Sequence, residues 1–100
     1  MPNWTVVAAY AGGLHSMTRN LALDLKPVRV NLISPGLVDT ELWSHMSEEQ
    51  KQGFFKQMEE KLPTGRVGKV DDVAEAYIYA MRDKNLTGSI ISTNSGALLV

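Results

Sequence analysis

The chain has 100 residues, 44% of them hydrophobic, a formal net charge of −1 and no cysteine. This length accommodates one domain at most, and the lack of cysteine excludes disulfide frameworks, thiolate metal sites and cysteine nucleophiles. The balanced charge argues against nucleic acid or an anionic membrane surface as a partner. The longest apolar stretch, residues 6–11, is far shorter than the roughly 18 residues that span a bilayer. We therefore expect a cytoplasmic protein without a membrane segment.

Hydrophobic periodicity predicts a first helix over about residues 8–25. Its expected packed face consists of long apolar side chains at helical spacing, namely Leu14, Met17, Leu21 and Leu25. Gly12 and Gly13 interrupt this helix, and each glycine costs about 1 kcal/mol relative to alanine. Two adjacent glycines therefore predict close packing against another segment, such as a second helix.

Lys26-Pro27 ends this helix, because proline lacks a backbone donor and disfavours helical angles in the residue before it. Residues 28–33 then predict a short strand rich in β-branched side chains. Ser34-Pro35-Gly36 stops the strand. Residues 37–43 are expected to form a loop or a short helical turn with Thr40 as its cap.

Two further helices are predicted in the second half. Ser47 and Gln50 have the spacing of a capping box at the start of a helix over about residues 48–61. Asp71 and Asp72 place negative charge in the first turn of a third helix, and Arg82 lies at its C-terminal end, as the helix dipole favours. The expected packed face of this third helix is Val73, Ala76, Tyr77, Ala80 and Met81.

The last elements are a strand over residues 88–92, a turn over residues 94–96 and an apolar tail. The order is therefore helix, strand, two helices, strand. Two strands joined by a long helical connection are expected to be parallel with a right-handed crossover. Because parallel sheets are covered on both faces and two strands are too few, we expect the back half of a larger α/β sheet with one open strand edge.

Four segments of the sequence carry a family resemblance. They are Leu14-x-x-Met17-Thr18-Arg19-x-Leu21-Ala22-x-Asp24-Leu25, Arg29-Val30-Asn31-x-Ile33-Ser34-Pro35-Gly36-x-Val38-x-Thr40, Gly65-Arg66-Val67-Gly68-x-x-x-Asp72-Val73-Ala74-Glu75-Ala76 and Thr87-Gly88-Ser89-Ile90-Ile91. In this order and near this spacing, they closely resemble the C-terminal half of short-chain dehydrogenases/reductases. The resemblance covers nearly the whole chain.

The resemblance implies the C-terminal part of a Rossmann-type doubly wound parallel sheet. Residues 1–100 would then be a single partial domain that lacks the N-terminal dinucleotide-binding half. The implied activity is hydride transfer between NAD or NADP and the alcohol or carbonyl carbon of a small-molecule substrate.

The resemblance also implies a cofactor-binding segment over residues 35–40, at the carboxyl edge of the sheet, where open α/β folds bind ligands. Pro35 and Gly36 turn the chain and expose the backbone near Val38, which is then expected to hold a carboxamide. The Thr40 hydroxyl and a helix N-terminus are expected to meet a phosphate. The candidate cofactor-binding residues are therefore Pro35, Gly36, Val38 and Thr40; without the flanking match, Pro-Gly would indicate only a turn.

The catalytic residues of the family are not found in usable form. The glycine loop and the strand that carries the catalytic Ser have no counterpart in the sequence. The family register places the Tyr and Lys of Tyr-x-x-x-Lys at Val7 and Ala11, whereas starting from Tyr10 places Leu14 at the Lys position. Either way, the ammonium that lowers the tyrosine pKa and orients the nicotinamide ribose is missing. Tyr10 is the one remaining candidate, and a tyrosine at a helix start is more often half-buried with its hydroxyl at the surface.

Side chains in residues 43–58 lie where the family has a mobile substrate lid. They are Trp43, His45, Phe54, Phe55 and Met58. These side chains either line an apolar substrate pocket or belong to a helix that buries Phe and Met against the sheet. His15 and His45 lie far apart without a third ligand, so no metal site is expected.

Two functional hypotheses follow. In the first, the chain is the C-terminal portion of an NAD(P)-dependent oxidoreductase, inactive alone, from a truncated product or a gene prediction that starts at an internal Met1. In the second, a non-catalytic remnant docks onto a full-length relative through its open strand edge or its Gly12-Gly13 helix. Helices at this place in the family commonly pack against their copy in another subunit, which implies a homo-oligomer or pairing with such a relative. A non-catalytic dinucleotide binder is disfavoured because the pyrophosphate half is missing.

Overall fold

The computed structural model describes residues 2–100, so the expectation about Met1 lies outside the described residues. The described elements comprise three α-helices, four strands and two 3-10 turns. In chain order they are α1 (Thr5–Asp24), β1 (Leu32–Pro35), β2 (Val38–Asp39), η1 (Glu41–Trp43), α2 (Glu48–Lys61), β3 (Gly68–Lys69), α3 (Val70–Arg82), β4 (Ile90–Thr93) and η2 (Ala97–Leu99). The α/β class and the predicted order of the helices and of the two longer strands are confirmed.

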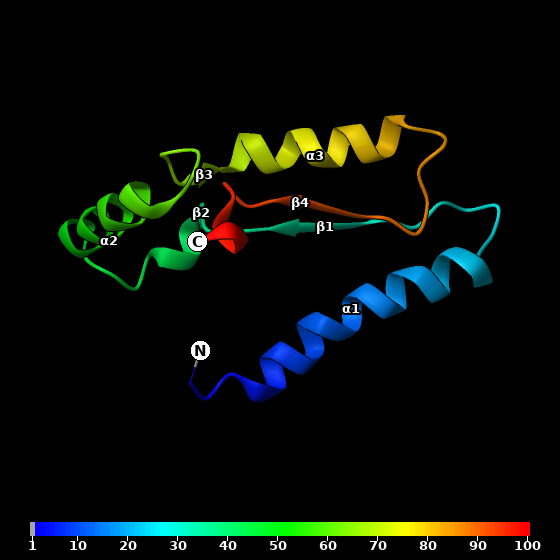
Figure 1. Cartoon of the computed structure of the whole chain (residues 1–100), viewed down its shortest axis with the longest axis horizontal. Helices are drawn as coiled ribbons and strands as arrows, with labels where there is room; N and C mark the ends of the chain where they lie inside the picture. Colours follow the sequence, from blue (N-terminus) through cyan, green and yellow to red (C-terminus); the bar gives the residue numbers. More distant parts are fainter. Residues whose placement is uncertain (1) are drawn as a thin grey trace.

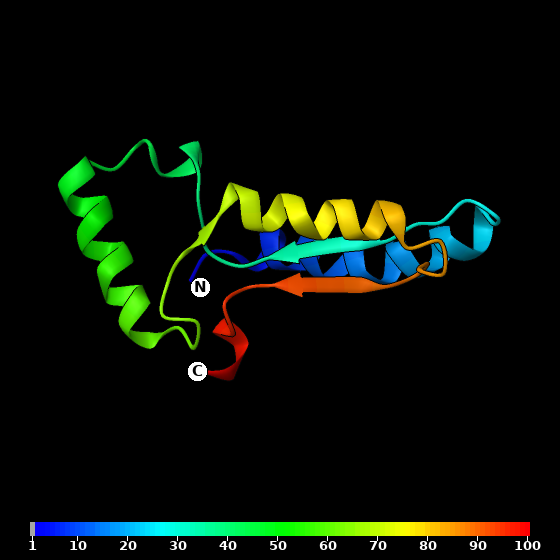
Figure 2. The same cartoon turned by 90° about the horizontal axis from the view of Figure 1, so that it is seen from above.

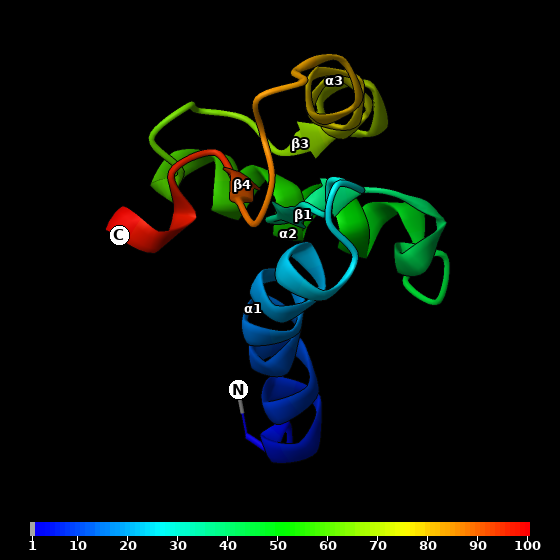
Figure 3. The ribbon, with the colours of Figure 1, turned by 90° about the vertical axis from the view of Figure 1, so that its right-hand side faces the viewer.

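The elements form three layers around a small parallel sheet. Strands β1 and β4 pair in parallel, from Leu32 opposite Ile90 to Pro35 opposite Thr93, which confirms the predicted orientation. Helix α1 covers one face of this sheet and α3 the other (Figure 1; Figure 3). Helix α2 lies beyond the carboxyl ends of both strands, as the view from above shows (Figure 2).

The first strand lies later in the sequence than predicted, at Leu32–Pro35 instead of residues 28–33. The reason lies in two polar side chains that the strand prediction included. The Arg29 guanidinium donates to the carbonyl oxygens of Ala80 and Leu86 at 2.8 and 3.1 Å. Asn31 donates to the Leu86 carbonyl at 2.9 Å and accepts from the Ser89 amide. These side-chain bonds accompany two backbone bonds, from the Gly88 amide to the Val30 carbonyl and from the Leu32 amide to the Ser89 carbonyl, and a regular strand begins only at Leu32. The second strand is likewise displaced, to Ile90–Thr93.

Helix α1 begins three residues before its predicted start, and only its C-terminal half packs on the sheet. The packed side chains are Leu14, Thr18, Leu21 and Ala22; of these, Thr18 is buried and the others are partly buried. Met17 and Leu25 are half exposed, contrary to the prediction. A helix of 20 residues is about 30 Å long, whereas a strand of four residues spans about 13 Å. The N-terminal half of α1 diverges from the sheet (Figure 1; Figure 3).

The two glycines of α1 do not lie at a close approach. A Cβ atom built on Gly12 or Gly13 meets no atom within 4 Å among the described residues. Within residues 2–100, this segment therefore has no close-packing partner, and its packing against a second molecule stays a prediction.

The predicted start of α2 is confirmed. The Ser47 hydroxyl accepts from the Gln50 amide at 3.1 Å, and the Gln50 side chain accepts from the Ser47 amide at 3.2 Å. This reciprocal pair satisfies two backbone donors that the first turn leaves free. Local sequence therefore determines where α2 begins.

Helix α3 also begins where its acidic pair predicts. Asp72 accepts from the Lys69 amide at 2.9 Å and from the Arg66 guanidinium at 2.9 Å. The predicted packed face is correct for Val73, Ala76 and Ala80, which are partly buried. It is wrong for Tyr77 and Met81, which are mostly exposed because no described segment covers that side of the helix.

The tightest packing lies at one end of the molecule instead of under the sheet. Phe55, Leu62 and Val67 form the buried cluster, and the side chains that pack around it are Leu37, Trp43, Phe54, Met58 and Ala97. The accessible surface is 7610 Å², whereas a globular monomer of 11.0 kDa exposes about 5,600 Å². The sheet and its helices therefore leave much apolar surface uncovered. No described helix combines the length and hydrophobicity needed to cross a membrane.

Candidate functional site

The candidate site lies at the carboxyl end of β1. Three of the four predicted residues, Pro35, Val38 and Thr40, line one apolar groove of about 360 Å³. The opposite wall is formed by residues at the start of α3, namely Val70, Val73, Ala74 and Tyr77. None of these four residues was predicted for the site, although Val73 and Tyr77 were predicted to share one face of their helix. Their approach to residues 35–40 depends on how α3 crosses the sheet, for which the sequence contains no local signal.

Gly36 does not line this groove. Its amide donates to the Thr93 carbonyl at 3.0 Å, and a Cβ atom at this position would lie 2.8 Å from the Asn94 Cα and Cβ atoms. Glycine is therefore required because the segments after β1 and β4 approach each other closely here. Gly36 contributes to the site indirectly, because it allows the chain to turn towards Val38.

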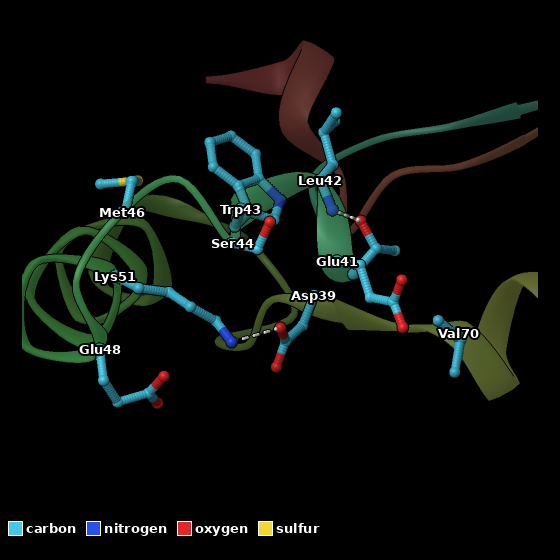
Figure 4. Close-up of a pocket in the computed structure, with 10 residues that line it drawn as sticks. Asp39, Glu41, Leu42, Trp43, Ser44, Met46, Glu48, Lys51 and Val70 are labelled. Atoms are coloured by element: carbon cyan, nitrogen blue, oxygen red, sulfur yellow. Dashed lines mark hydrogen bonds and ion pairs between the residues drawn. The ribbon is translucent and has the colours of Figure 1, made fainter.

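A second, polar cavity of about 770 Å³ lies on the other side of β2. Its lining residues are Asp39, Thr40, Glu41, Leu42, Trp43, Ser44, Met46, Glu48, Lys51 and Val70, drawn in Figure 4. Successive side chains of a strand point to opposite sides. Val38 accordingly lines the apolar groove and Asp39 the polar cavity, while Thr40 and Val70 border both.

Thr40 caps η1, as predicted, because its hydroxyl oxygen accepts from the Leu42 amide at 3.3 Å. The hydroxyl makes no other hydrogen bond within residues 2–100. Its proton is therefore available to an oxygen atom of a ligand.

An ion pair joins α2 to β2 across the polar cavity. The Lys51 Nζ atom lies 2.9 Å from the Asp39 Oδ1 atom (Figure 4). The hydrogen bond to Asp39 raises the pKa of Lys51, partial desolvation opposes that rise, and the charges of Asp39 and Glu48 add to it. Lys51 is therefore a stable cation in the cavity wall, a role that no local sequence pattern could have indicated.

The predicted lid residues divide between the two alternatives. Trp43 lines the polar cavity and also packs on Phe54 and Phe55, with ring centroids 5.5 and 6.0 Å apart. Phe55 is buried, and Phe54 and Met58 pack against the same cluster, at the end of the sheet instead of on its face. His45 is exposed and lines neither cavity. In this segment, Trp43 is thus both a cavity residue and a core residue.

Tyr10 stands apart from both cavities. It is 72% exposed on the N-terminal half of α1, more exposed than the half-buried tyrosine expected at a helix start. Val7 and Ala11, the positions of the family Tyr and Lys, lie on the same exposed stretch of α1. In residues 2–100, no group of three His, Cys, Asp or Glu side chains could hold a metal ion.

Comparison with known proteins gives matches over the whole chain. Residues 1–100 match the family described as an SDR-like Rossmann domain. Short-chain dehydrogenase/reductase fsr5 of Gibberella fujikuroi is 42% identical over 101 aligned positions, which cover 97% of this chain and 37% of that protein.

Two solved structures superpose on the whole chain. A small-chain dehydrogenase in complex with NADPH has a TM-score of 0.93 at 37% identity, with 100% of this chain and 46% of that chain covered. The MalC reductase/Diels-Alderase from Malbranchea aurantiaca has a TM-score of 0.92 at 39% identity, with 100% and 39% covered. The chain thus spans less than half the length of each of these three relatives.

Proposed function

This chain belongs to the short-chain dehydrogenase/reductase family, and from that premise we propose that it is the C-terminal portion of an NAD(P)-dependent oxidoreductase. The proposed reaction is hydride transfer between a nicotinamide cofactor and an alcohol or carbonyl substrate. The supporting observation is that Pro35, Val38 and Thr40 line one groove at the carboxyl end of β1. In open α/β sheets, this edge is where ligands bind.

The residues of the groove fit one end of such a cofactor. Pro35, Val38 and Val73 offer an apolar wall for a flat ring, and the Thr40 hydroxyl offers a donor for a phosphate or amide oxygen. The Val38 carbonyl accepts from the Trp43 indole at 3.0 Å and keeps a second lone pair for a carboxamide. When bound, the cofactor would supply or accept the hydride; the residues of this chain would hold its nicotinamide end and exclude water from it.

The polar cavity is the proposed place of the substrate. It shares Thr40 and Val70 with the groove, so a molecule in the cavity lies next to a ring in the groove. The chain alone is expected to be inactive, because the family positions for Tyr and Lys hold Val7 and Ala11. Residues outside this chain are expected to contribute to the selection of the substrate and to the choice between NAD and NADP.

Hybrid proteins test this proposal. In the relative that was solved with NADPH, the matching segment is replaced either by residues 2–100 or by residues 12–100 of this chain. Both hybrids are expected to bind NADPH. The shorter graft keeps the relative's own residues at the positions of Val7 and Ala11, so it alone is expected to oxidise NADPH with a panel of carbonyl compounds. A folded hybrid of residues 12–100 that binds no NADPH contradicts the proposal.

The same pair of hybrids tests Tyr10. If Tyr10 acts as a displaced catalytic acid, the hybrid of residues 2–100 turns over, and Tyr10→Phe nearly abolishes that turnover. An active Phe variant, or an inactive parent hybrid that still binds NADPH, removes Tyr10 from the catalytic candidates.

A second candidate function is supported by the exposed half of α1. Apolar side chains there have no covering segment in the described part of the chain, namely Val6, Val7 and Tyr10 on the helix and Trp4 directly before it. Large exposed apolar patches mark interaction surfaces, so a non-catalytic module that docks onto a full-length relative is the alternative. Mixing the chain with fsr5 and measuring co-elution on a sizing column tests it; separate elution at micromolar concentrations contradicts docking.

A further inference from the structure

Strand β2 is the wall between the two cavities of the site. Val38 faces the groove, Asp39 faces the polar cavity, and Thr40, which follows, borders both. A shift of this strand therefore changes the proposed cofactor groove and the proposed substrate cavity together.

The backbone pairing of β2 is short. Within the described residues, it pairs with the two-residue strand β3, in the register of Val38 opposite Gly68 and Asp39 opposite Lys69. An isolated pair of strands is marginally stable even when it is longer than this. Contacts from side chains must therefore contribute to holding β2 in place.

Two side chains from the segment that follows connect to β2. The Trp43 indole donates to the Val38 carbonyl at 3.0 Å, and the Lys51 ammonium pairs with the Asp39 carboxylate at 2.9 Å (Figure 4). The Lys51 side chain is only 19% exposed and its Nζ atom lies 5.6 Å from the centroid of the Phe55 ring. Phe55 belongs to the buried cluster, so Lys51 connects the packed side of α2 directly to β2.

We propose that Lys51 is a positioning residue that couples helix α2 to strand β2 and so holds Val38 and Thr40 in place. The consequence for the cofactor rests on the proposed function. The other lysines of α2, Lys56 and Lys61, form no ion pair in residues 2–100. The proposed coupling therefore depends on Lys51 specifically and is not a general effect of positive charge on α2.

Hydrogen exchange of the full chain measures the coupling without any cofactor. In Lys51→Met, the backbone amides of residues 37–43 are expected to exchange about two- to fivefold faster, the range that a partly exposed ion pair produces. Lys56→Met, a matched change on the same helix, is expected to leave these amides unchanged. The double variant Lys51→Asp with Asp39→Lys restores an opposite-charge pair and is expected to slow the exchange again. Unchanged exchange in Lys51→Met, or equal acceleration in Lys56→Met, overturns the proposal.

If circular dichroism shows that Lys51→Met has lost helix content, Lys51→Arg provides a second test. Arginine keeps the charge and the long stem, so it is expected to retain slow exchange over residues 37–43. Fast exchange in a folded Arg variant would show that charge at this position does not hold β2, which also overturns the proposal.

NADPH titration of the hybrid of residues 12–100 tests the consequence for the site. Lys51→Met is expected to raise the Kd by about two- to fivefold, with Lys56→Met unchanged and Lys51→Arg close to the parent. An unchanged Kd in Lys51→Met overturns the coupling to the cofactor groove. If the parent hybrid binds no NADPH, the proposed function fails, and the exchange measurement on the full chain still decides whether Lys51 holds β2.

Discussion

Thr40 lies at the end of β2, at the start of η1 and on the border of both cavities. Its hydroxyl group can cap η1 and contact a ligand at the same time. The oxygen accepts a hydrogen bond from the Leu42 amide, and the proton remains available for donation. The sequence predicted this cap because the donor lies two residues away. The resemblance grouped Thr40 with Pro35 and Val38, but the sequence could not show that the start of α3 forms the opposite wall of their groove.

Replacement of Thr40 tests its proposed ligand contact. In the hybrid of residues 12–100, Thr40→Val is expected to weaken NADPH binding about tenfold or more, because a hydrogen bond to a charged group contributes about 1.5–3 kcal/mol. Thr40→Ser keeps the hydroxyl and is expected to bind as the parent does. Calorimetric titration measures both, and equal affinity of the Val variant and the parent removes Thr40 from the cofactor site.

Replacement by alanine is expected to change the free energy of unfolding in opposite directions at Gly36 and Gly53. Gly36→Ala places a Cβ atom 2.8 Å from Asn94 backbone, so it is expected to lower the free energy of unfolding by about 1–3 kcal/mol. Gly53 lies inside α2, where an added Cβ atom meets nothing within 4 Å, and Gly53→Ala is expected to stabilise by about 0.5–1 kcal/mol. Urea denaturation compares the two variants; a stable Gly36→Ala variant would mean that the two chain segments can separate without cost.

At the scale of elements, the starts of α2 and α3 were predicted correctly, whereas the start of α1 and the strand boundaries were not. The reciprocal bonds of Ser47 with Gln50 span three residues, so the sequence alone specifies them. The strand over residues 28–33 was displaced because Arg29 and Asn31 bind carbonyl groups more than fifty residues away in the chain. Propensity favoured a strand there, and tertiary hydrogen bonds decided against it.

The start of α3 should respond to acid through Asp72. The Lys69 amide, and after it the Arg66 guanidinium, lowers the pKa of the Asp72 carboxyl below its ordinary value. Ionised Asp72 thus stabilises the folded chain at pH values above its ordinary pKa, and this contribution is lost as the pH falls through the lower folded pKa.

Asp72→Asn tests this dependence. The variant is expected to have a lower free energy of unfolding than the parent near neutral pH, and the difference is expected to vanish in acid, below the folded pKa of Asp72. Urea unfolding followed by helix content across this range measures it. Asp71→Asn is the control, because Asp71 lies in the same first turn and should show a smaller effect. A difference between Asp72→Asn and the parent that persists in strong acid contradicts the prediction.

At the scale of the whole molecule, the chain is more open than its length requires. The radius of gyration is 15.8 Å, whereas a compact domain of this length has a value of about 13 Å. The accessible surface exceeds that of a globular monomer by roughly a third. Both values agree with the short length of the chain, which covers less than half the length of the relatives compared above. Its helices accordingly have apolar faces that no described segment covers.

Because apolar side chains on α1 are exposed, we expect the chain to associate with itself or to bind a hydrophobic dye. Val6→Glu removes one of the most exposed of them and is expected to reduce binding of a hydrophobic fluorescent dye and any concentration-dependent association, with little change in helix content. Ser16→Glu adds the same charge at an exposed polar position of the same helix and is the matched control. Equal dye binding by both variants and the parent would mean that the apolar surface of α1 does not drive association.

The sequence by itself determined the α/β class, the order of the helices and longer strands, the capped starts of α2 and η1, the acidic first turn of α3, and the family. These features depend on bonds between residues within a few positions of each other or on motifs read in order along the chain. Only the tertiary structure decided that β2 pairs with β3, that α3 closes the groove over Pro35 and Val38, that Lys51 reaches Asp39, and that half of α1 stays uncovered. Each of these depends on the path of the chain between residues far apart in sequence, where no local propensity acts and the packing of whole elements decides which side chains meet.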